Sequence, residues 1–494
     1  MTKEAPPPQR GAPTLRAPDS GRGPRLTPAA SPGPPRPLPQ AEVVVLVQMV
    51  VGLVAWAAVG RAAFRAPPPG ASTGGGLGAL QPPTPGAWDR PSLDRRWVEK
   101  SCRGAARADR RAAGADMGPG DAVLVTGAAG FIGFHAARRL RSLGVAVVGL
   151  DNFNPYYDPA LKRTRQRLLR EQGVYVAEGD LNDRALLDEL LDACAFTHVL
   201  HLAAQAGVRY AVRNPQAYIS ANVAGMTTLL EALVKQSPGG AGGAPGQGAD
   251  GDRGARAGAG AGAGDGRGTG ASGSGGPGGL RARVPKLVYA SSSSVYGLND
   301  RVPFREDDRV DQPASLYAAT KRSDELIAHA YSHIYGLSAT GLRFFTVYGP
   351  YGRPDMAYFD FTRRIVRGEP IQVFQYPEGK EMGRDFTYID DIVDGILGAL
   401  RSAPESAGAG AGSFRLFNLG NTNSVKLSDF IATLEDVLEQ PAQKEFVELP
   451  ATGDVLVTHA DVSAAQKAFG YTPKTSLREG LQKFVQWYDA EGPR

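Results

Sequence analysis

The feature that most constrains this chain is an apolar run that leads directly into closely spaced glycines. The run spans residues 122–126, and the glycines and the start of a helix-like segment follow within residues 127–133. Strand, tight turn and helix in this order form a pyrophosphate site, because the glycines permit the turn, admit backbone N–H groups to the anion and let helix and strand pack closely. The residues expected to contact a dinucleotide here are Gly127, Gly130, Phe131, Ile132 and Gly133.

A second apolar run, residues 145–150, ends in Asp151, which is followed by Asn152. A dinucleotide fold places an acid at this strand end, where it hydrogen-bonds the adenosine ribose hydroxyls. Because a carboxylate there repels a 2′-phosphate, we expect the cofactor to be NAD rather than NADP, with Asp151 and Asn152 among its contacts. On these two runs alone, a glycine-rich turn in another kind of α/β protein is the alternative.

Strand-like and helix-like segments alternate through the following residues. Strands are expected at 174–177 and 197–203, and helices at 159–172 and 183–193. Such alternation predicts an α/β fold, a Rossmann-type doubly wound parallel sheet with ligands at the carboxyl ends of its strands. The strand-end residues expected to contact the cofactor are Asp180, Leu181, Ala203 and Ala204. From position alone, ordinary turn residues explain these four equally well.

Composition divides the chain into folded and unfolded parts. Residues 1–41 form a basic, Pro-rich arm, residues 61–120 a Pro-, Gly- and Arg-rich stem, and residues 237–282 a Gly-rich insertion. These segments hold few large apolar side chains and cannot offset their own ordering entropy, so we expect a disordered arm and insertion and a flexible stem. The expected folded unit has an NAD-binding domain at 121–345 and a smaller C-terminal α/β substrate-binding lobe at 346–494.

Residues 43–60 are uncharged, apolar and just long enough to cross a bilayer. They lie too far from the N-terminus for an ordinary cleaved signal peptide, which favours a single membrane anchor. The basic arm before the span favours a type II orientation with the folded unit in the lumen, although Arg61 and Arg65 weaken the charge asymmetry. A transit-type extension and a buried apolar helix are the alternatives.

The net charge of +5 does not indicate a nucleic-acid-binding protein, because many surplus arginines lie in the arm and stem and show no interleaving with aromatic residues. Cys102 and Cys194, the two cysteines, fall in the expected stem and in an expected helix, so we predict no disulfide framework and no cysteine metal site. No other metal site is predicted. His198 and His201 lie on one expected strand, where core imidazoles are more common than catalytic ones.

The strongest catalytic pattern is a tyrosine and a lysine four residues apart. Ser315 is placed as the N-cap of a helix on which Tyr317 and Lys321 share one face. A phenol has a reference pKa of about 10. A neighbouring ammonium, with a cationic nicotinamide ring, favours the phenolate and makes a base for neutral pH. Tyr and Lys at this spacing also occur by chance, so the pattern gains weight only beside the glycine turn and a strand that ends in serines.

Together, the glycine turn, the acid-ended strand, the serine-ended strand and the Tyr-x-x-x-Lys helix resemble the extended short-chain dehydrogenase/reductase (NAD-dependent epimerase/dehydratase) family over residues 121–489. Within it, the chain is most similar to the UDP-glucuronate 4-epimerases of plants and algae, which have an N-terminal anchor in the Golgi membrane. The resemblance implies that Ser292 and Tyr317 are catalytic, that Lys321 assists them, and that Asn222 is a structural, cofactor-proximal asparagine. It also implies a homodimer through the helices that begin near Asn214 and Ser315.

The positions after the catalytic serine separate the subfamilies. Dehydratases have an Asp-Glu pair there and decarboxylating relatives have a Glu, whereas this chain has Ser293 and Ser294, so the resemblance implies epimerisation. Hydroxyls of Ser293 and Thr346 are candidates to hold a C6 carboxylate; plain loop residues are the alternative. Leu456 departs from the proline usual in the family, so the loop near the uracil is expected to differ slightly. The substrate-binding residues implied are Arg209, Ser293, Ser294, Thr346, Arg353 and Arg384.

The reaction implied is the interconversion of UDP-glucuronate and UDP-galacturonate through a 4-keto sugar, with tightly held NAD⁺. Tyr317 would take the C4 hydroxyl proton and Ser292 would relay it. A UDP-glucose 4-epimerase and a UDP-glucuronate decarboxylase are the neighbouring alternatives. A catalytically silent dinucleotide-binding sensor is the alternative outside enzymes, and such proteins typically lack the Tyr and Lys found here.

Overall fold

The computed structural model describes the folded unit and a short preceding helix. The expected arm, the apolar span at 43–60 and the Gly-rich insertion at 237–282 lie outside the described residues, as does most of the expected stem. The described residues are 93–102, 116–236, 284–376, 379–406, 412–449 and 453–493.

A seven-stranded, wholly parallel sheet forms the centre of the unit and confirms the predicted Rossmann-type fold. Its order is β3-β2-β1-β4-β5-β6-β10, so the chain reverses direction across the sheet between β1 and β4 and leaves a crevice at their carboxyl ends. The strands are β1 (Ala122–Thr126), β2 (Ala146–Asp151), β3 (Tyr175–Glu178), β4 (His198–His201), β5 (Lys286–Ser292), β6 (Ala339–Phe344) and β10 (Phe414–Leu419).

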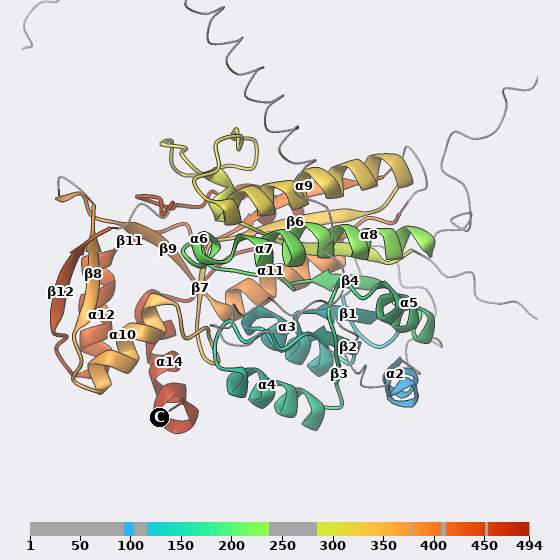
Figure 1. Cartoon of the computed structure of the whole chain (residues 1–494), viewed down its shortest axis with the longest axis horizontal. Coiled ribbons are helices and arrows are strands. Elements are labelled where there is room, and N and C mark those ends of the chain that lie inside the picture. Colours follow the sequence, from blue (N-terminus) through green and yellow to red (C-terminus); the bar gives the residue numbers. More distant parts are fainter. Residues whose placement is uncertain are drawn as a thin grey trace, which may run out of the picture. The chain divides into compact units, whose positions relative to one another are not determined.

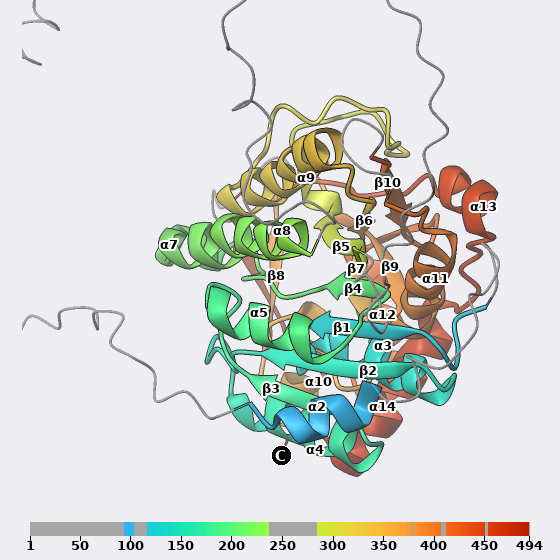
Figure 2. The same cartoon turned by 90° about the vertical axis from the view of Figure 1, so that its right-hand side faces the viewer.

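Helices cover both faces of this sheet because its strands are apolar on both sides. On β1, Val123 and Val125 belong to one core cluster, whereas Leu124 belongs to the other. Figure 2 shows the two helical layers on opposite sides of the strands. One layer holds α2 (Arg95–Cys102), α5 (Arg184–Ala193), α8 (Gly225–Lys235) and α9 (Leu316–Tyr335). The other holds α3 (Phe131–Ser142), α4 (Pro159–Glu171) and α11 (Ile389–Ser402).

Two small sheets and four helices complete the C-terminal part of the described chain. Of these elements, β8, β12, α10 and α12 lie at the left of Figure 1. The first sheet has β11 (Ser424–Lys426), β9 (Gly383–Tyr388) and β7 (Thr346–Tyr348), and the second has β12 (Lys444–Glu448) and β8 (Ile371–Gln375). The helices are α10 (Ala357–Val366), α12 (Leu427–Leu438), α13 (Ser463–Phe469) and α14 (Leu477–Glu491). The expected boundary at 346 is not a clean division, because β10 follows it and is an edge strand of the large sheet.

A continuous helical segment precedes the Gly-rich insertion. Short helices α6 (Tyr210–Arg213) and α7 (Pro215–Tyr218) lead into the π-helical stretch η2 (Ile219–Ala224) and then into α8. Among the described residues, Pro215–Lys235 is the one helix long and apolar enough to cross a membrane, but nearly half of it is buried. Since it packs on α5 and α9, it is part of the helical layer over the sheet.

The prediction of no disulfide was wrong, because Cys102 and Cys194 are joined. Cys102 ends α2, which the composition of the stem had concealed, and Cys194 follows α5. The short helix is held by the fully buried Val98 and by contact between the rings of Trp97 and Tyr175. The two cysteines are 92 residues apart, with Cα atoms 5.8 Å from each other, so tertiary packing alone brings them together.

Candidate active site

A cavity of about 1210 Å³ opens at the carboxyl ends of the central strands and extends to the small sheets. It exceeds the roughly 300–1,000 Å³ of a pocket for one small ligand. All the predicted catalytic, cofactor and substrate residues line this cavity except Asn222. The lining residues that sequence predicted are Gly127, Gly130, Phe131, Ile132, Gly133, Asp151, Asn152, Asp180, Leu181, Ala203, Ala204, Arg209, Ser292, Ser293, Ser294, Tyr317, Lys321, Thr346, Arg353 and Arg384.

The glycine turn between β1 and α3 is as crowded as a phosphate-binding turn requires. A Cβ at Gly127, whose φ is +69°, would lie 2.8 Å from the backbone nitrogen of Ala203. At Gly133 it would lie 2.1 Å from the carbonyl oxygen of Gly127, so this position excludes any side chain. Gly130 occupies the N-cap of α3 and gives no side-chain oxygen to it, which leaves the helix N-terminus suited to an anion.

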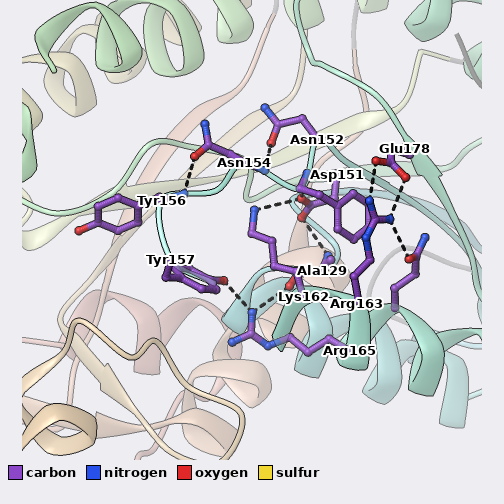
Figure 3. Close-up of polar contacts among 12 residues, drawn as sticks. Ala129, Asp151, Asn152, Asn154, Tyr156, Tyr157, Lys162, Arg163, Arg165 and Glu178 are labelled. Atoms are coloured by element: carbon purple, nitrogen blue, oxygen red, sulfur yellow. Dashed lines mark hydrogen bonds and ion pairs between the residues drawn. The ribbon is translucent and has the colours of Figure 1, made fainter. Parts of the chain in front are cut away.

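Asp151 is fixed at the end of β2 by three donors (Figure 3). Its Oδ2 accepts a hydrogen bond from the Ala129 N–H at 3.0 Å, and its Oδ1 accepts one from the Phe153 N–H at 2.8 Å. Lys162 Nζ on α4 lies 3.2 Å from Oδ1. Lys162 also lines the cavity and was not predicted, because nothing in the spacing of α4 distinguishes it from the neighbouring basic residues.

Arg165, also on α4, is a second residue that sequence analysis missed. Its buried guanidinium donates to the Ala129 carbonyl at 2.9 Å and to the Tyr157 hydroxyl at 2.8 Å, as Figure 3 shows. It also donates to the carbonyls of Tyr351 at 2.7 Å and Gly352 at 3.0 Å. The side chain therefore joins the glycine turn to the loop that carries the predicted substrate arginine at 353.

Asp180 shows both of the features that sequence left open. It lines the cavity, and it is a turn residue, because Oδ1 accepts the Asn182 N–H at 2.9 Å while Oδ2 accepts from the Asn152 amide at 2.9 Å. Asn222 instead lies buried behind the cavity. Its Oδ1 accepts the Gln205 N–H at 2.8 Å and its Nδ2 donates to Thr320 at 2.9 Å, so it ties α9 to the loop after β4.

The catalytic candidates meet at the carboxyl end of β5. Ser292 ends this strand, and its Oγ accepts the Ser294 N–H at 3.2 Å. Tyr317 and Lys321 begin α9, whose N-cap is Ser315 as predicted, with its side chain 3.1 Å from the Ala318 nitrogen. All three candidate side chains line the same cavity.

Lys321 is buried and forms an ion pair that sequence analysis did not anticipate, with Nζ 2.8 Å from Asp324 Oδ2. Burial alone would lower the pKa of Lys321, but Asp324 and Tyr317 outweigh this effect and raise it. His201 on β4 bonds Thr126 Oγ1 at 2.7 Å, and burial followed by the charge of Lys321 lowers its pKa to about 3. His201 is therefore a neutral core histidine, as predicted.

Two predicted arginines meet near the small sheets. Arg209 Nε lies 3.0 Å from Asp454, and its guanidinium stacks 4.2 Å from the centre of the Phe374 ring. Arg384 lies at 4.0 Å from the same carboxylate and donates to the Leu456 carbonyl at 3.1 Å. Because the backbone of Leu456 makes this contact, the change from proline leaves it in place. Phe374 and Asp454 had no local signal in the sequence.

The third arginine, Arg353, belongs to a separate cluster. Its Nη2 lies 2.6 Å from Asp355, whose carboxylate also accepts from the Tyr156 hydroxyl at 3.0 Å. Burial would lower the pKa of Arg353, but Asp355 raises it, so the guanidinium stays charged. Residues with small hydroxyls also line the cavity, namely Ser293 and Ser294 directly after β5 and Thr346 at the start of β7.

Known proteins resemble this chain in sequence and in fold. The model of the NAD dependent epimerase/dehydratase family matches residues 123–420. UDP-glucuronate 4-epimerase 1 of Arabidopsis thaliana is 51% identical over 374 residues, which cover 75% of this chain and 77% of the relative. UDP-glucuronate 4-epimerase 3 of the same plant is 50% identical over 395 residues, covering 79% and 80%.

Solved structures agree with these relatives. A UDP-glucuronic acid 4-epimerase from Bacillus cereus, in complex with UDP-glucuronic acid and NAD, matches with a TM-score of 0.60 at 28% identity, over 75% of this chain and 99% of that one. MoeE5 in complex with UDP-glucuronic acid and NAD matches with a TM-score of 0.56 at 32% identity, over the same shares.

Proposed function

Because the chain belongs to the NAD dependent epimerase/dehydratase family, we propose that it interconverts UDP-glucuronate and UDP-galacturonate. The observation that carries the proposal is the single cavity in which the glycine turn, the Tyr317–Lys321 pair and the serines after β5 meet. The choice of substrate rests on the UDP-glucuronate 4-epimerases of Arabidopsis thaliana, which are about 50% identical to this chain.

NAD fits the residues on one side of the cavity. The glycine turn leaves no room for side chains, which suits a pyrophosphate against the N-terminus of α3. Asp151 would accept hydrogen bonds from the adenosine ribose, with Lys162 balancing its charge. The full set that we assign to NAD is Gly127, Gly130, Phe131, Ile132, Gly133, Asp151, Asn152, Asp180, Leu181, Ala203, Ala204, Tyr317 and Lys321. Asn222 supports this set from behind.

In the reaction, Tyr317 takes the proton of the C4 hydroxyl and later returns one to the same oxygen. Ser292 orients that hydroxyl and relays the proton, and Lys321 favours the phenolate while it holds the nicotinamide ribose. Bound NAD⁺ would supply the redox chemistry, as the acceptor and then the donor of the C4 hydride. Because the sugar turns its other face before it is reduced, the configuration at C4 is inverted with no net redox change.

The substrate side of the cavity favours epimerisation over elimination. Ser293 and Ser294 stand where other branches of the family carry acids, so no acidic side chain there is available to remove water. A 4-keto uronate is a β-keto acid and loses CO₂ readily. We assign Ser293 and Thr346 to the C6 carboxylate, held in an orientation unfavourable for that loss, and Ser294 to the sugar. Arg209, Arg353 and Arg384 would neutralise the diphosphate and contact the nucleoside.

Product analysis tests the proposal. The purified protein is incubated with UDP-glucuronate, and separately with UDP-glucose, without added NAD, and the nucleotide sugars are separated by chromatography. A mixture that contains UDP-galacturonate is expected and would also show that NAD is retained. UDP-xylose would instead identify a decarboxylase. Turnover of UDP-glucose alone would identify a UDP-glucose 4-epimerase, and no turnover of either substrate would favour the silent sensor.

We also propose that the protein is a type II Golgi membrane protein with the folded unit in the lumen. The apolar residues 43–60 would form the anchor. The Cys102–Cys194 disulfide supports the orientation, because disulfides persist in oxidising compartments and are rare in the cytosol. In intact Golgi vesicles, the folded unit should resist added protease until detergent is present. Digestion without detergent would place the unit on the cytosolic side.

A homodimer is our proposal for the assembly. Three apolar side chains on the outer helical surface are exposed, Ile219 by 41% on η2, and Leu326 by 55% and Ile334 by 43% on α9. A second copy would cover them in a symmetric contact. Light scattering should show a dimer for the natural protein and a monomer for Leu326→Asp. Val366→Asp, an equally polar change at an exposed position on α10, is the control and should remain dimeric.

A further inference from the structure

A buried carboxylate beside the catalytic lysine is the feature of α9 that the proposed reaction does not explain. Lys321 and Asp324 are exposed by only 2% and 1%, and their charged atoms lie 2.8 Å apart. The next residue, Glu325, is engaged elsewhere, since it binds Arg343 at 2.8 Å and Ser291 at 2.6 Å. Asp324 is therefore the carboxylate that directly contacts Lys321.

Stability does not explain this buried pair. Removing two charges from water costs about as much as their attraction returns, so buried ion pairs stabilise proteins little. Asp324 is also incompletely bonded, because its Oδ1 has no hydrogen-bond partner among the described residues. A partly satisfied buried carboxylate is costly. Its place one helical turn from Lys321, which lines the cavity, points to a role in the reaction.

We propose that Asp324 is a positioning residue of the reaction, which holds the Lys321 ammonium beneath Tyr317 and offsets part of its charge. The inference rests on the proposed function. Asp324 thereby limits how strongly Lys321 favours the phenolate form of Tyr317. Without the carboxylate, the same lysine would act on the phenol with its full charge.

Within the described part of the chain, few other charges act on this pair. On α9 itself, Lys321 faces Asp324, Tyr317 and Glu325. From β4 it faces His201, which is neutral because burial lowers its pKa to about 3.

Asp324 in turn faces Lys321 and Glu325 on α9, and Tyr289 from β5. Burial raises the pKa of Tyr289 far above the ordinary value, so this phenol is neutral as well. Glu325 keeps its charge in any variant of Asp324, because burial of this carboxyl is outweighed by Arg343, which lowers its pKa.

Replacing Asp324 with Asn keeps the shape of the side chain and removes its charge. A lost negative charge stabilises the Tyr317 phenolate, so the acid limb of the pH profile of kcat/KM should move to lower pH. Asp324 and Tyr317 are seven residues, about two helical turns, apart on α9. At this separation, a shift of about one pH unit is expected. The alkaline limb should also move to lower pH, because Lys321 loses the carboxylate that raises its pKa.

The test compares pH profiles of the full chain, D324N and a matched control. Asp188→Asn also removes a carboxylate that pairs with a lysine, at 2.9 Å from Lys235, but on the surface, and its profile should equal that of the natural protein. Tyrosinate absorbance gives a second readout that needs no turnover. The difference between the titrations of the natural protein and of Tyr317→Phe isolates this one phenol among the 17 tyrosines. The midpoint of that difference should move by the same amount in D324N.

An unchanged acid limb and an unchanged Tyr317 titration in folded D324N would overturn the inference. Asp324→Ala, which also suits a helix, takes its place if D324N does not fold, with the same expected shift. If neither variant folds, Asp324 is a structural residue and the inference is likewise overturned. Failure of the natural protein to turn over UDP-glucuronate would instead refute the proposed function. Because the tyrosinate titration needs no turnover, it would still test the role of Asp324.

Discussion

The two sides of the cavity are built by different physical means. On the dinucleotide side, the contacts use the backbone of the turn and of the first strands, as in the bond from the Ala129 N–H to Asp151, 22 residues apart. On the sugar-nucleotide side, polar side chains join segments that are far apart in the chain, as in Arg209 and Asp454, 245 residues apart, and Tyr156 and Asp355, 199 residues apart. The first side is thus determined by the shape of the turn, and the second by how distant segments pack.

Tyr317 stands where the two sides meet, so Tyr317→Phe should have the largest effect. The phenol is the proposed base for the C4 hydroxyl, and its loss should lower kcat by about 10³-fold. Binding of UDP-glucuronate and retention of NAD should change little. The control is Tyr335→Phe on the same helix, which should keep full activity. Equal losses in both variants would show that α9, rather than the phenol, is responsible.

Gly133→Ala breaks the side that the backbone builds. The added Cβ would meet the Gly127 carbonyl at 2.1 Å, so the turn must open. We expect a loss of about 2–3 kcal/mol in the free energy of unfolding and little NAD released when the purified variant is denatured. Gly368→Ala controls for backbone strain, because Gly368 has a φ of +68° but no atom within 4 Å of an added Cβ. It should keep its NAD.

The sequence predicted the features that leave a local pattern and missed residues whose role depends on a contact that the pattern does not show. The dinucleotide turn was predicted because the steric demands of such a turn leave glycines at fixed spacing, and the parallel sheet because strand-like and helix-like segments alternate. Lys162 and Asp454 were missed because each acts through a partner that only packing reveals. For Asp324 a signal existed, since it lies one helical turn after Lys321 on the same face.

Two larger features were also beyond the sequence. The disulfide joins Cys102 to Cys194 across 92 residues, and α2 is too short to stand out in a Pro- and Gly-rich segment. The strand β10 pairs with β6 although β7, β8 and β9 lie between them in the chain. A linear reading assigned β10 to the C-terminal lobe, because return of the chain to the first sheet leaves no local mark.

Arg353→Lys tests the side built by distant packing. Lysine keeps the charge but lacks the planar fork that Arg353 uses to hold Asp355. Asp355 in turn accepts a hydrogen bond from Tyr156, 199 residues away. We expect KM for UDP-glucuronate to rise about tenfold, the worth of one charged hydrogen bond, with NAD content unchanged. Arg367→Lys, at an exposed position after α10, should have no effect. Loss of NAD from Arg353→Lys would show that the two sides are not independent, with Arg165 as the bridge between them.

The smallest effect, and the finest test of the sugar side, is expected from Thr346→Ala. This change removes one hydroxyl at the start of β7 and leaves the arginines in place. Loss of one hydrogen bond to the C6 carboxylate should weaken UDP-glucuronate binding by about two- to fivefold. A less constrained carboxylate in the 4-keto sugar should also leave as CO₂ more often, so chromatography should reveal a UDP-pentose among the products. Thr472→Ala, on an exposed loop, is the control. Unchanged affinity and no pentose would remove Thr346 from the carboxylate site and leave Ser293 as the hydroxyl that holds it.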